Sequence, residues 1–196
     1  MVVAKYDKKW PEDFRKIKEE LIKIISAPAH IEHVGSTSIP GMNAKPIIDI
    51  DVGLKNWSDF EAVKNALAEI GYKHEGDKGI TGRQAFCREG TAHNEILDAI
   101  DHHLYVCSVD NEEYQRHILF RNYLRTHTQA RDRYNQIKEE ILAKVGSDNR
   151  TGYVQMKEEE YRDFFEDIIE KAGNDKMNLT IRLVAIDDYD QMPQGE

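Results

Sequence analysis

Asp49 and Asp51 are separated by one apolar residue in residues 47–52, which read Ile-Ile-Asp-Ile-Asp-Val. On a β-strand, alternate side chains point to the same face, so the two carboxylates are expected side by side. Two neighbouring carboxylates repel each other unless a positive charge lies between them, and Mg²⁺ is a usual one. We therefore predict that Asp49 and Asp51 are catalytic and bind Mg²⁺, with Mn²⁺ as the alternative.

A Gly-Ser pair, Gly35-Ser36, precedes these acids by fewer than twenty residues and follows a short expected strand. A glycine lets the backbone approach a phosphate closely, and a serine hydroxyl can bond to it. Mg²⁺ is typically held by one or two carboxylates together with substrate phosphates. The order of strand, Gly-Ser and Asp-x-Asp thus predicts a nucleoside triphosphate site. Taken singly, an acidic strand face is often only solvated, and Gly-Ser is often an ordinary turn.

Residues 31–41 and 45–50, together with further short motifs, resemble the GrpB family. The further motifs, in chain order, are Trp10-Pro11, Gly82-Arg83, residues 102–106, residues 119–125, and Tyr153 with Lys157. The resemblance covers about residues 5–170, and this family is assigned to the nucleotidyltransferase fold. It implies that Gly35 and Ser36 contact the triphosphate and that Asp49 and Asp51 hold the metal.

The resemblance also favours substrate-binding roles for Lys45, Arg83 and Arg121, whose positive charges would neutralise phosphates. Arg121 has a structural alternative, a salt-bridged helix face exposed to solvent. Tyr153 and Lys157 are four residues apart on an expected helix and could close over a nucleotide base. Packing of Tyr153 in the core is the alternative.

The third carboxylate of nucleotidyltransferases has no clear counterpart here. On the strand expected near residues 102–107, His103 shares a face with Asp101 and Tyr105. If His103 faced the core, Leu104 would be exposed, at a cost of about 1.5–3 kcal/mol. We therefore predict that His103 faces the cleft, where it completes the metal shell or acts as a general base. His102 is expected to have a structural role.

The composition excludes several other classes of protein. The chain has 196 residues, 27 Lys and Arg, 36 Asp and Glu, and a formal net charge of −9, which argues against general nucleic-acid binding. Its two cysteines favour neither a disulfide framework nor a Cys-rich zinc site. We expect no membrane segment, no signal peptide and a cytoplasmic location.

The predicted fold is a nucleotidyltransferase-like α/β unit, a mixed β-sheet flanked by helices with a helical C-terminal part. Residues 1–173 form one domain, divided into an α/β part, 1–109, and a helical part, 110–173. Helices are expected at 11–26, 58–70, 111–126, 129–145 and 153–172. Strands are expected at 30–34, 47–53, 83–88, 95–99 and 102–107. Residues 174–196 are expected to form a strand at 179–186, through which the chain could oligomerise, and a polar tail.

Three functions remain open at this point. The first is a Mg²⁺-dependent nucleotidyltransferase that moves a nucleotidyl group from a nucleoside triphosphate to an unidentified small-molecule acceptor. The second is a non-catalytic module that binds a nucleotide or a CoA-related ligand. The third is a metal-dependent hydrolase that uses His103 with Asp49 or Asp51.

Overall fold

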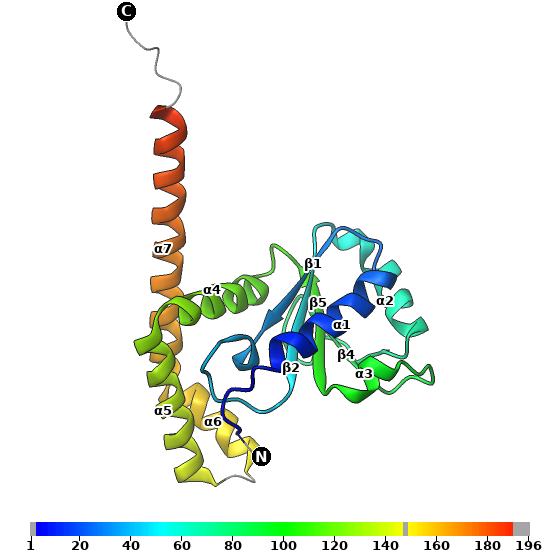
Figure 1. The fold of residues 1–196 in the computed structure, drawn as a ribbon, viewed down its shortest axis with the longest axis horizontal. Helices are drawn as coiled ribbons and strands as arrows, with labels where there is room; N and C mark the ends of the chain where they lie inside the picture. The colour runs from blue at the N-terminus through cyan, green and yellow to red at the C-terminus, as the bar shows by residue number, and fades with distance from the viewer. Residues whose placement is uncertain (1–2, 147–148, 190–196) are drawn as a thin grey trace, which may run out of the picture.

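The computed structural model describes residues 3–146 and 149–189, with the backbone alone at 150, 158 and 178–189. An α/β part comes first along the chain, and four helices follow it (Figure 1). The α/β part contains α1 (Trp10–Ile24), β1 (Ala29–Val34), η1 (Ser36–Ser38), β2 (Ile48–Leu54), η2 (Trp57–Asp59), α2 (Phe60–Glu69), β3 (Lys73–His74), β4 (Arg83–Cys87), α3 (Glu95–Ala99) and β5 (His102–Ser108). The helical part contains α4 (Glu112–Thr126), α5 (Thr128–Val145), α6 (Arg150–Glu160) and α7 (Arg162–Tyr189).

The five strands form one mixed sheet in the order β1-β2-β5-β4-β3. β2 and β5 run parallel at its centre, and the other neighbouring pairs are antiparallel. The register sets Asp49 opposite His103 and Asp51 opposite Tyr105. Because side chains alternate along a strand, these four residues belong to one face of the two central strands, which we call the acidic face. The mixed sheet predicted from the sequence is confirmed.

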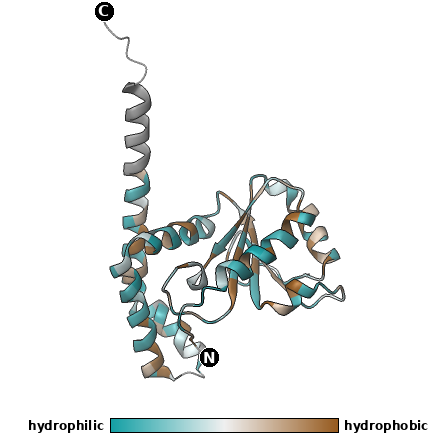
Figure 2. Ribbon diagram, in the orientation of Figure 1, coloured by the Kyte–Doolittle hydropathy of each residue, from teal (hydrophilic) through white to brown (hydrophobic). Residues whose placement is uncertain are grey.

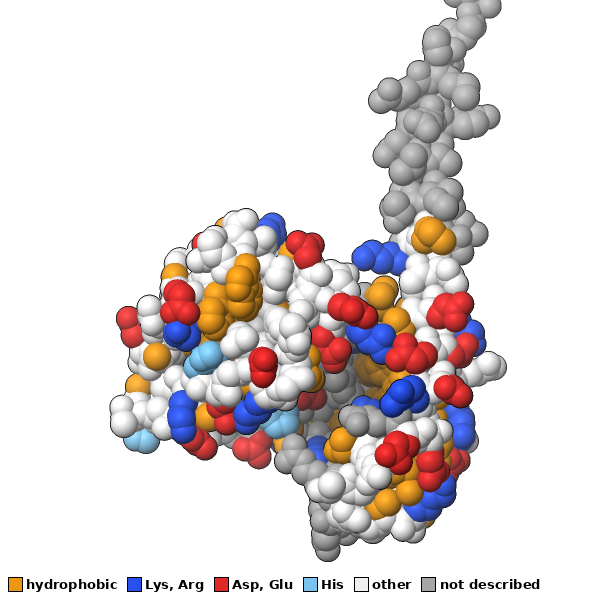
Figure 3. Space-filling view, turned by 180° about the vertical axis from the view of Figure 1, so that it is seen from behind, with side chains coloured by type: hydrophobic (Ala, Val, Ile, Leu, Met, Phe, Trp, Pro, Cys, Tyr) orange, Lys and Arg blue, Asp and Glu red, His pale blue; other side chains and the backbone are white. Residues whose placement is uncertain are grey.

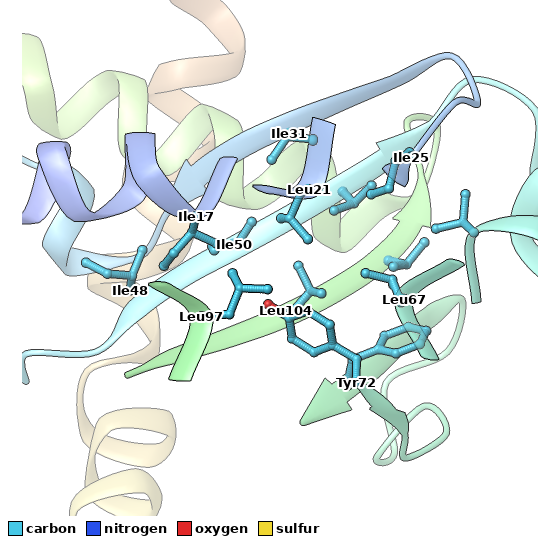
Figure 4. Packing of buried hydrophobic residues seen from close by; sticks show 14 of the residues in the cluster. Ile17, Leu21, Ile25, Ile31, Ile48, Ile50, Leu67, Tyr72, Leu97 and Leu104 are labelled. Carbon is cyan, nitrogen blue, oxygen red and sulfur yellow. The ribbon is translucent and has the colours of Figure 1, made fainter. Parts of the chain in front are cut away.

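The opposite face of the sheet carries the main hydrophobic core. Ile48, Ile50 and Leu104 are buried there, packed against Ile17 and Leu21 of α1 (Figure 4). α2 and α3 complete this layer through Leu67 and Leu97. The strands are rich in hydrophobic residues, whereas α1 shows hydrophilic residues over much of its length (Figure 2). This packing fixes the central strands, and with them the acidic face.

A second core holds the C-terminal helices together and joins them to the loop after β1. Buried Leu124, Ile137, Ile141 and Ile168 come from three helices, and Ile39 and Met42 come from the loop. An ion pair adds a polar link, because buried Arg121 of α4 contacts the partly buried Glu32 of β1 at 2.5 Å. The helical part therefore packs on the end of β1, beside the acidic face of the sheet.

Two expected strands are helical in the structure. Residues 95–99 form α3, because the Asn94 side chain accepts hydrogen bonds from the backbone amides of Ile96 and Leu97 and caps a helix. Residues 179–186 continue α7 and join no sheet (Figure 1). Extending an existing helix needs no new nucleus, which favours helix over an isolated strand. Oligomerisation through a C-terminal strand therefore has no support, and the end of the expected polar tail, 190–196, lies outside the described residues.

Three helix boundaries also differ from the expected ones. The helix expected at 58–70 begins with a 3₁₀ turn, η2, which leads directly into α2 with Asp59 already in helical conformation. The helix expected at 111–126 begins one residue later, at Glu112, because the Asn111 side chain caps α4. The helix expected at 153–172 is two helices, and the break at Tyr161 lets aromatic residues of both pack into the second core.

In the described residues, no helix combines the length and the apolar character needed to cross a membrane.

Candidate nucleotide-binding site

The Gly-Ser turn lies directly against the first of the two acids. Gly35 has a positive φ of 67°, a conformation that glycine adopts without strain. A Cβ at this position would lie 2.2 Å from Asp49 Oδ2, so only glycine leaves room for the carboxylate. The turn and the acid therefore form one surface, at the point where β1 ends and β2 begins.

Asp49 is oriented by the residue paired with it across the sheet. His103 Nδ1 lies 2.9 Å from Asp49 Oδ1. Because an ionised carboxylate only accepts hydrogen bonds, Nδ1 carries the hydrogen, and in the neutral ring Nε2 is left as an acceptor. Both side chains are partly exposed, at 44% for His103 and 33% for Asp49. The structure thus places His103 on the acidic face, whereas His102 bonds to the Tyr72 hydroxyl and to the backbone oxygen of Ile100.

Asp51 lies deeper and has a different histidine partner. Its side chain is 1% exposed, and its Oδ2 accepts a hydrogen bond from His117 Nδ1 of α4 at 2.7 Å. His117 Nε2 lies 3.2 Å from Glu113 Oε1. Burial disfavours the charged imidazole, but the hydrogen bonds to Asp51 and Glu113 outweigh this and raise the pKa of His117 to about 9. An imidazolium therefore lies between two carboxylates. The second oxygen of Asp51, Oδ1, is buried and has no hydrogen-bond partner among the described residues.

Ser36 is bonded to a buried lysine that is distant in the sequence. Lys138 of α5 is 4% exposed, and its Nζ donates to Ser36 Oγ at 2.7 Å and to the backbone oxygen of Asn43 at 2.5 Å. It also lies 4.3 Å from the centre of the Tyr134 ring. Burial lowers the pKa of Lys138 to about 7; Lys157 acts in the same direction and Asp49 opposes it. A basic group is thus held at the Gly-Ser turn and can gain charge when an anion binds there.

Two adjoining cavities cover this face, and we call them together the acidic cleft. The first, of about 240 Å³, is lined by Ser36, Asp49, His103, Lys138 and Tyr153, among others. The second, of about 280 Å³, shares Ser36, Asp49, Tyr134 and Lys157 with the first and adds Gly35, Arg83, Tyr105, His117 and Arg121. The combined space lies in the range of small-ligand sites.

The predicted substrate-binding residues all line this cleft, but their contacts with the rest of the protein differ. Lys45, Tyr153 and Lys157 lie around the cavity that contains Lys138. Arg83 stacks on Tyr105, with its guanidinium carbon 4.2 Å from the ring centre, and its buried Nε has no hydrogen-bond partner among the described residues. Arg121 is 8% exposed and bonds to Glu32 and to the backbone oxygen of His33. It therefore anchors α4 to β1 at the edge of the cleft.

The carboxylate oxygens of Asp49 and Asp51 fit a hard divalent cation whose other coordination positions are left for the substrate. Asp51 Oδ1 is a buried carboxylate oxygen without a partner among the described residues, and Asp49 lies on the same strand face. In the described part of the chain, no three His, Cys, Asp or Glu side chains are grouped so that they could hold a metal ion. Mg²⁺ is typically coordinated by one or two carboxylates, and phosphate and water supply its other ligands.

Sequence reasoning missed Lys138, His117 and Glu113. The first two interrupt buried helix faces. Lys138 belongs to the stripe that includes Tyr134 and Ile141, and His117 lies between Tyr114 and Arg121 on the buried side of α4. The sequence signal that could have revealed Lys138 and His117 is a charged or titratable residue on an otherwise buried helix face.

Comparison with known proteins identifies the family. The family model described as "GrpB protein" matches residues 1–171. The chain belongs to the GrpB family. It is 35% identical over 156 residues to the UPF0157 protein YqkA of Bacillus subtilis, a match that covers 79% of this chain and 43% of YqkA, so the chain spans less than half of that relative. It is 31% identical over 153 residues to the glutamate-rich protein GrpB of Alkalihalophilus pseudofirmus, with 77% and 86% of the two chains covered.

Solved structures support the same fold. The crystal structure of the conserved protein GrpB from Enterococcus faecalis superposes with a TM-score of 0.70 at 28% identity, covering 87% of this chain and 98% of that one. The Cid1 poly(U) polymerase bound to MgGTP superposes with a TM-score of 0.52 at 14% identity, covering 74% of this chain and 46% of Cid1. The likeness to Cid1 is one of fold alone. This GrpB protein therefore has a nucleotidyltransferase-like fold.

Proposed function

We propose that this GrpB-family protein binds a Mg²⁺–nucleoside triphosphate in the acidic cleft and transfers the nucleotidyl group to a small-molecule acceptor. One observation carries the proposal: the Gly35-Ser36 turn and the Asp49 and Asp51 carboxylates meet on one face, with Lys138 bonded to the serine. The Ser36 hydroxyl, the Asp49 carboxylate and the buried amine of Lys138 thereby line one cavity of small-molecule size. Asp51 is buried on the same strand face.

The chain's own residues bind and orient the triphosphate. The Gly35-Ser36 backbone and the Ser36 hydroxyl contact phosphate oxygens, and Lys138 supplies a positive charge beside them. Lys45 and Lys157 add charge around the same cavity, and Tyr153 offers an aromatic surface to the base. Asp49 and Asp51 hold Mg²⁺, which when bound stabilises negative charge on the phosphate oxygens.

At the α-phosphorus, the transfer step forms one bond and breaks one. The acceptor hydroxyl oxygen bonds to the α-phosphorus, the bond from that phosphorus to the α,β-bridging oxygen breaks, and pyrophosphate leaves. The hydroxyl proton passes to His103 Nε2, the ring atom left free to accept it when Nδ1 donates to Asp49. The same hydrogen bond positions the Asp49 carboxylate.

A second candidate, nucleotide binding without transfer, is favoured by what lies opposite the two acids. The paired positions on β5 are His103 and Tyr105, so this face has two carboxylates rather than three. His117 already supplies a positive charge to Asp51. Both features reduce the capacity of the site for two metal ions.

Two measurements on one sample separate these candidates. Calorimetry with Mg²⁺ and a nucleotide whose α,β-bridge is not cleavable reports binding. Nucleotides labelled at the α-phosphorus, incubated with protein-free small-molecule extract, report transfer. Label in a new product with equimolar pyrophosphate supports transfer, and binding with no new product supports the second candidate. Absence of binding for all four nucleotides with Mg²⁺ contradicts both.

A further inference from the structure

The second cavity of the acidic cleft, of about 280 Å³, lies between the sheet and the helical part. The sheet contributes Asp49 of β2, Tyr105 of β5 and Arg83 of β4 to its lining. The helices contribute Phe120 of α4 and Tyr134 of α5. Seen from behind, the molecule is hollowed between the sheet-bearing body and the helices of the C-terminal part, with charged side chains of both signs along the edge (Figure 3). A ligand in this cavity therefore contacts the acidic face on one side and the helices on the other.

Arg83 lies on the same side of the sheet as the two acids. In the register of β4 with β5, Ala85 is paired with Tyr105, and Tyr105 is paired in turn with Asp51 of β2. Because side chains alternate along a strand, Arg83, two residues before Ala85, belongs to the acidic face. Its guanidinium carbon lies 4.2 Å from the centre of the Tyr105 ring. The charged group therefore lies over the residue that is paired with Asp51.

Arg83 keeps hydrogen-bonding capacity for a ligand. A guanidinium carries N–H donors on all three of its nitrogens, and the buried Nε of Arg83 has no hydrogen-bond partner in the described part of the chain. The pKa of Glu113 is lowered first by its hydrogen bond to His117, and Arg83 contributes to a smaller extent through its charge. Arg121, the other arginine that lines this cavity, is bonded to Glu32. Of the two arginines, Arg83 is thus the one suited to bind an oxyanion.

The acidic face offers ligands for one metal ion rather than two. β5 places His103 and Tyr105 opposite Asp49 and Asp51, so these four described positions carry two carboxylates. In two-metal sites, the two ions together stabilise the attacking and the leaving oxygen of the displacement. On this face, Arg83 provides a further positive charge without needing another carboxylate.

We propose that Arg83 binds the α-phosphoryl group of the nucleotide, and that the site uses a single Mg²⁺ with this guanidinium in place of a second metal ion. The inference rests on the proposed function, because it assigns a residue and a metal count to the same site. When the acceptor oxygen bonds to the α-phosphorus, pyrophosphate leaves, the acceptor proton passes to His103 Nε2, and negative charge stays on the α-phosphoryl oxygens. Arg83 stabilises that charge from the β4 side, while Asp49 and Asp51 hold the metal from β2.

Two matched probes separate the α-phosphoryl contact from the contacts to the other phosphates. One is a nucleoside triphosphate whose α,β-bridge is not cleavable, and the other is pyrophosphate, which lacks the α-phosphoryl group. Both are titrated with Mg²⁺ into the full chain by calorimetry. Arg83→Met should weaken nucleotide binding at least tenfold and leave pyrophosphate binding within twofold of that of the native chain. Lys138→Met, at the Gly-Ser turn, should weaken both.

Further variants exclude a purely structural effect. Arg83→Lys keeps the charge but not the planar group of donors, so its nucleotide affinity should lie between those of the native chain and Arg83→Met. In Arg83→Ala, added methylguanidinium should raise nucleotide affinity at least threefold, a rescue that a misfolded site would not allow. Arg133→Met, at a surface arginine paired with Glu140, should change neither probe. Urea denaturation checks that each variant is folded.

Mn²⁺ counts the metal ions, because it suits carboxylate ligands and its unbound form is observed by electron paramagnetic resonance. It is titrated into the native chain with an equimolar amount of the non-cleavable nucleotide. We expect one Mn²⁺ per complex, and one again in Arg83→Met at a chain concentration that keeps the nucleotide bound.

Two Mn²⁺ per native complex, an unchanged nucleotide affinity in Arg83→Met, or an equal loss of affinity for nucleotide and pyrophosphate in that variant would each overturn the inference. If nucleotide binding still requires Mg²⁺ and Asp49 when one of these results is found, the proposed function stands without it. If the native chain binds no nucleotide with Mg²⁺, the proposed function fails, and the role of Arg83 fails with it.

Discussion

Gly35 lies directly beneath the carboxylate of Asp49, and a Cβ at position 35 would lie 2.2 Å from Asp49 Oδ2. Gly35→Ala must therefore displace the acid as well as strain the backbone at φ 67°. We expect a loss of about 1–3 kcal/mol in the free energy of unfolding, measured by urea denaturation, together with at least tenfold weaker Mg²⁺–nucleotide binding.

Gly79→Ala is the matched control for this variant. Gly79 has a φ of 81°, but a Cβ there would meet no atom within 4 Å. It carries the same kind of backbone strain without the clash, so stability should fall while nucleotide binding is kept. Equal nucleotide binding in both alanine variants would show that Gly35 has no special relation to the site.

Arg121→Met should act on stability more than on nucleotide binding. Arg121 is 8% exposed and pairs with Glu32, so its loss leaves a half-buried carboxylate without its cation. We expect the free energy of unfolding to fall by about 2–4 kcal/mol. In a double-mutant cycle with Glu32→Gln, the losses of the two single variants should be far from additive, because both remove the same ion pair. If nucleotide affinity falls more than tenfold while stability is kept, Arg121 binds phosphate instead.

Lys138 should make stability depend on pH in a defined direction. Its pKa is lowered by burial from 10.5 to about 7, so the folded chain releases this proton at lower pH than the unfolded chain. Stability must then rise with pH between about 7 and 10.5, since the unfolded state binds more protons there. We expect the free energy of unfolding, measured by urea denaturation, to rise more in the native chain than in Lys138→Met. Between pH 6.5 and 9.5 the difference between the two chains should change by about 1–3 kcal/mol in favour of the native chain. A difference that is constant with pH would show that the lysine is normally charged.

The acidic face could be predicted from the sequence because it depends on local pattern. Alternation along residues 47–53 already sets Asp49 and Asp51 on one side of a strand. The Lys138 contact could not be predicted in this way, since it joins residues 102 positions apart. The His117 contact with Asp51 spans 66 positions and depends on how α4 crosses the sheet. Residues 95–99 were assigned to the wrong class because one side chain, that of Asn94, decides their conformation.

His103→Asn tests the histidine paired with Asp49. The asparagine amide can still donate to the carboxylate, but it cannot take up a proton as Nε2 can. We expect nucleotide binding within about threefold of that of the native chain and transfer reduced at least a hundredfold, a size typical of lost general-base catalysis. Full transfer activity in a folded His103→Asn chain would remove His103 from the reaction.

The central claim is that the two carboxylates bind nucleotide through Mg²⁺, and titration calorimetry on three samples tests it most directly. A nucleoside triphosphate with a non-cleavable α,β-bridge is titrated into the native chain with Mg²⁺, into the native chain with EDTA, and into Asp49→Asn with Mg²⁺. The account predicts saturable one-to-one binding in the first sample and at least tenfold weaker binding in the other two. Equal affinity in all three samples would contradict it.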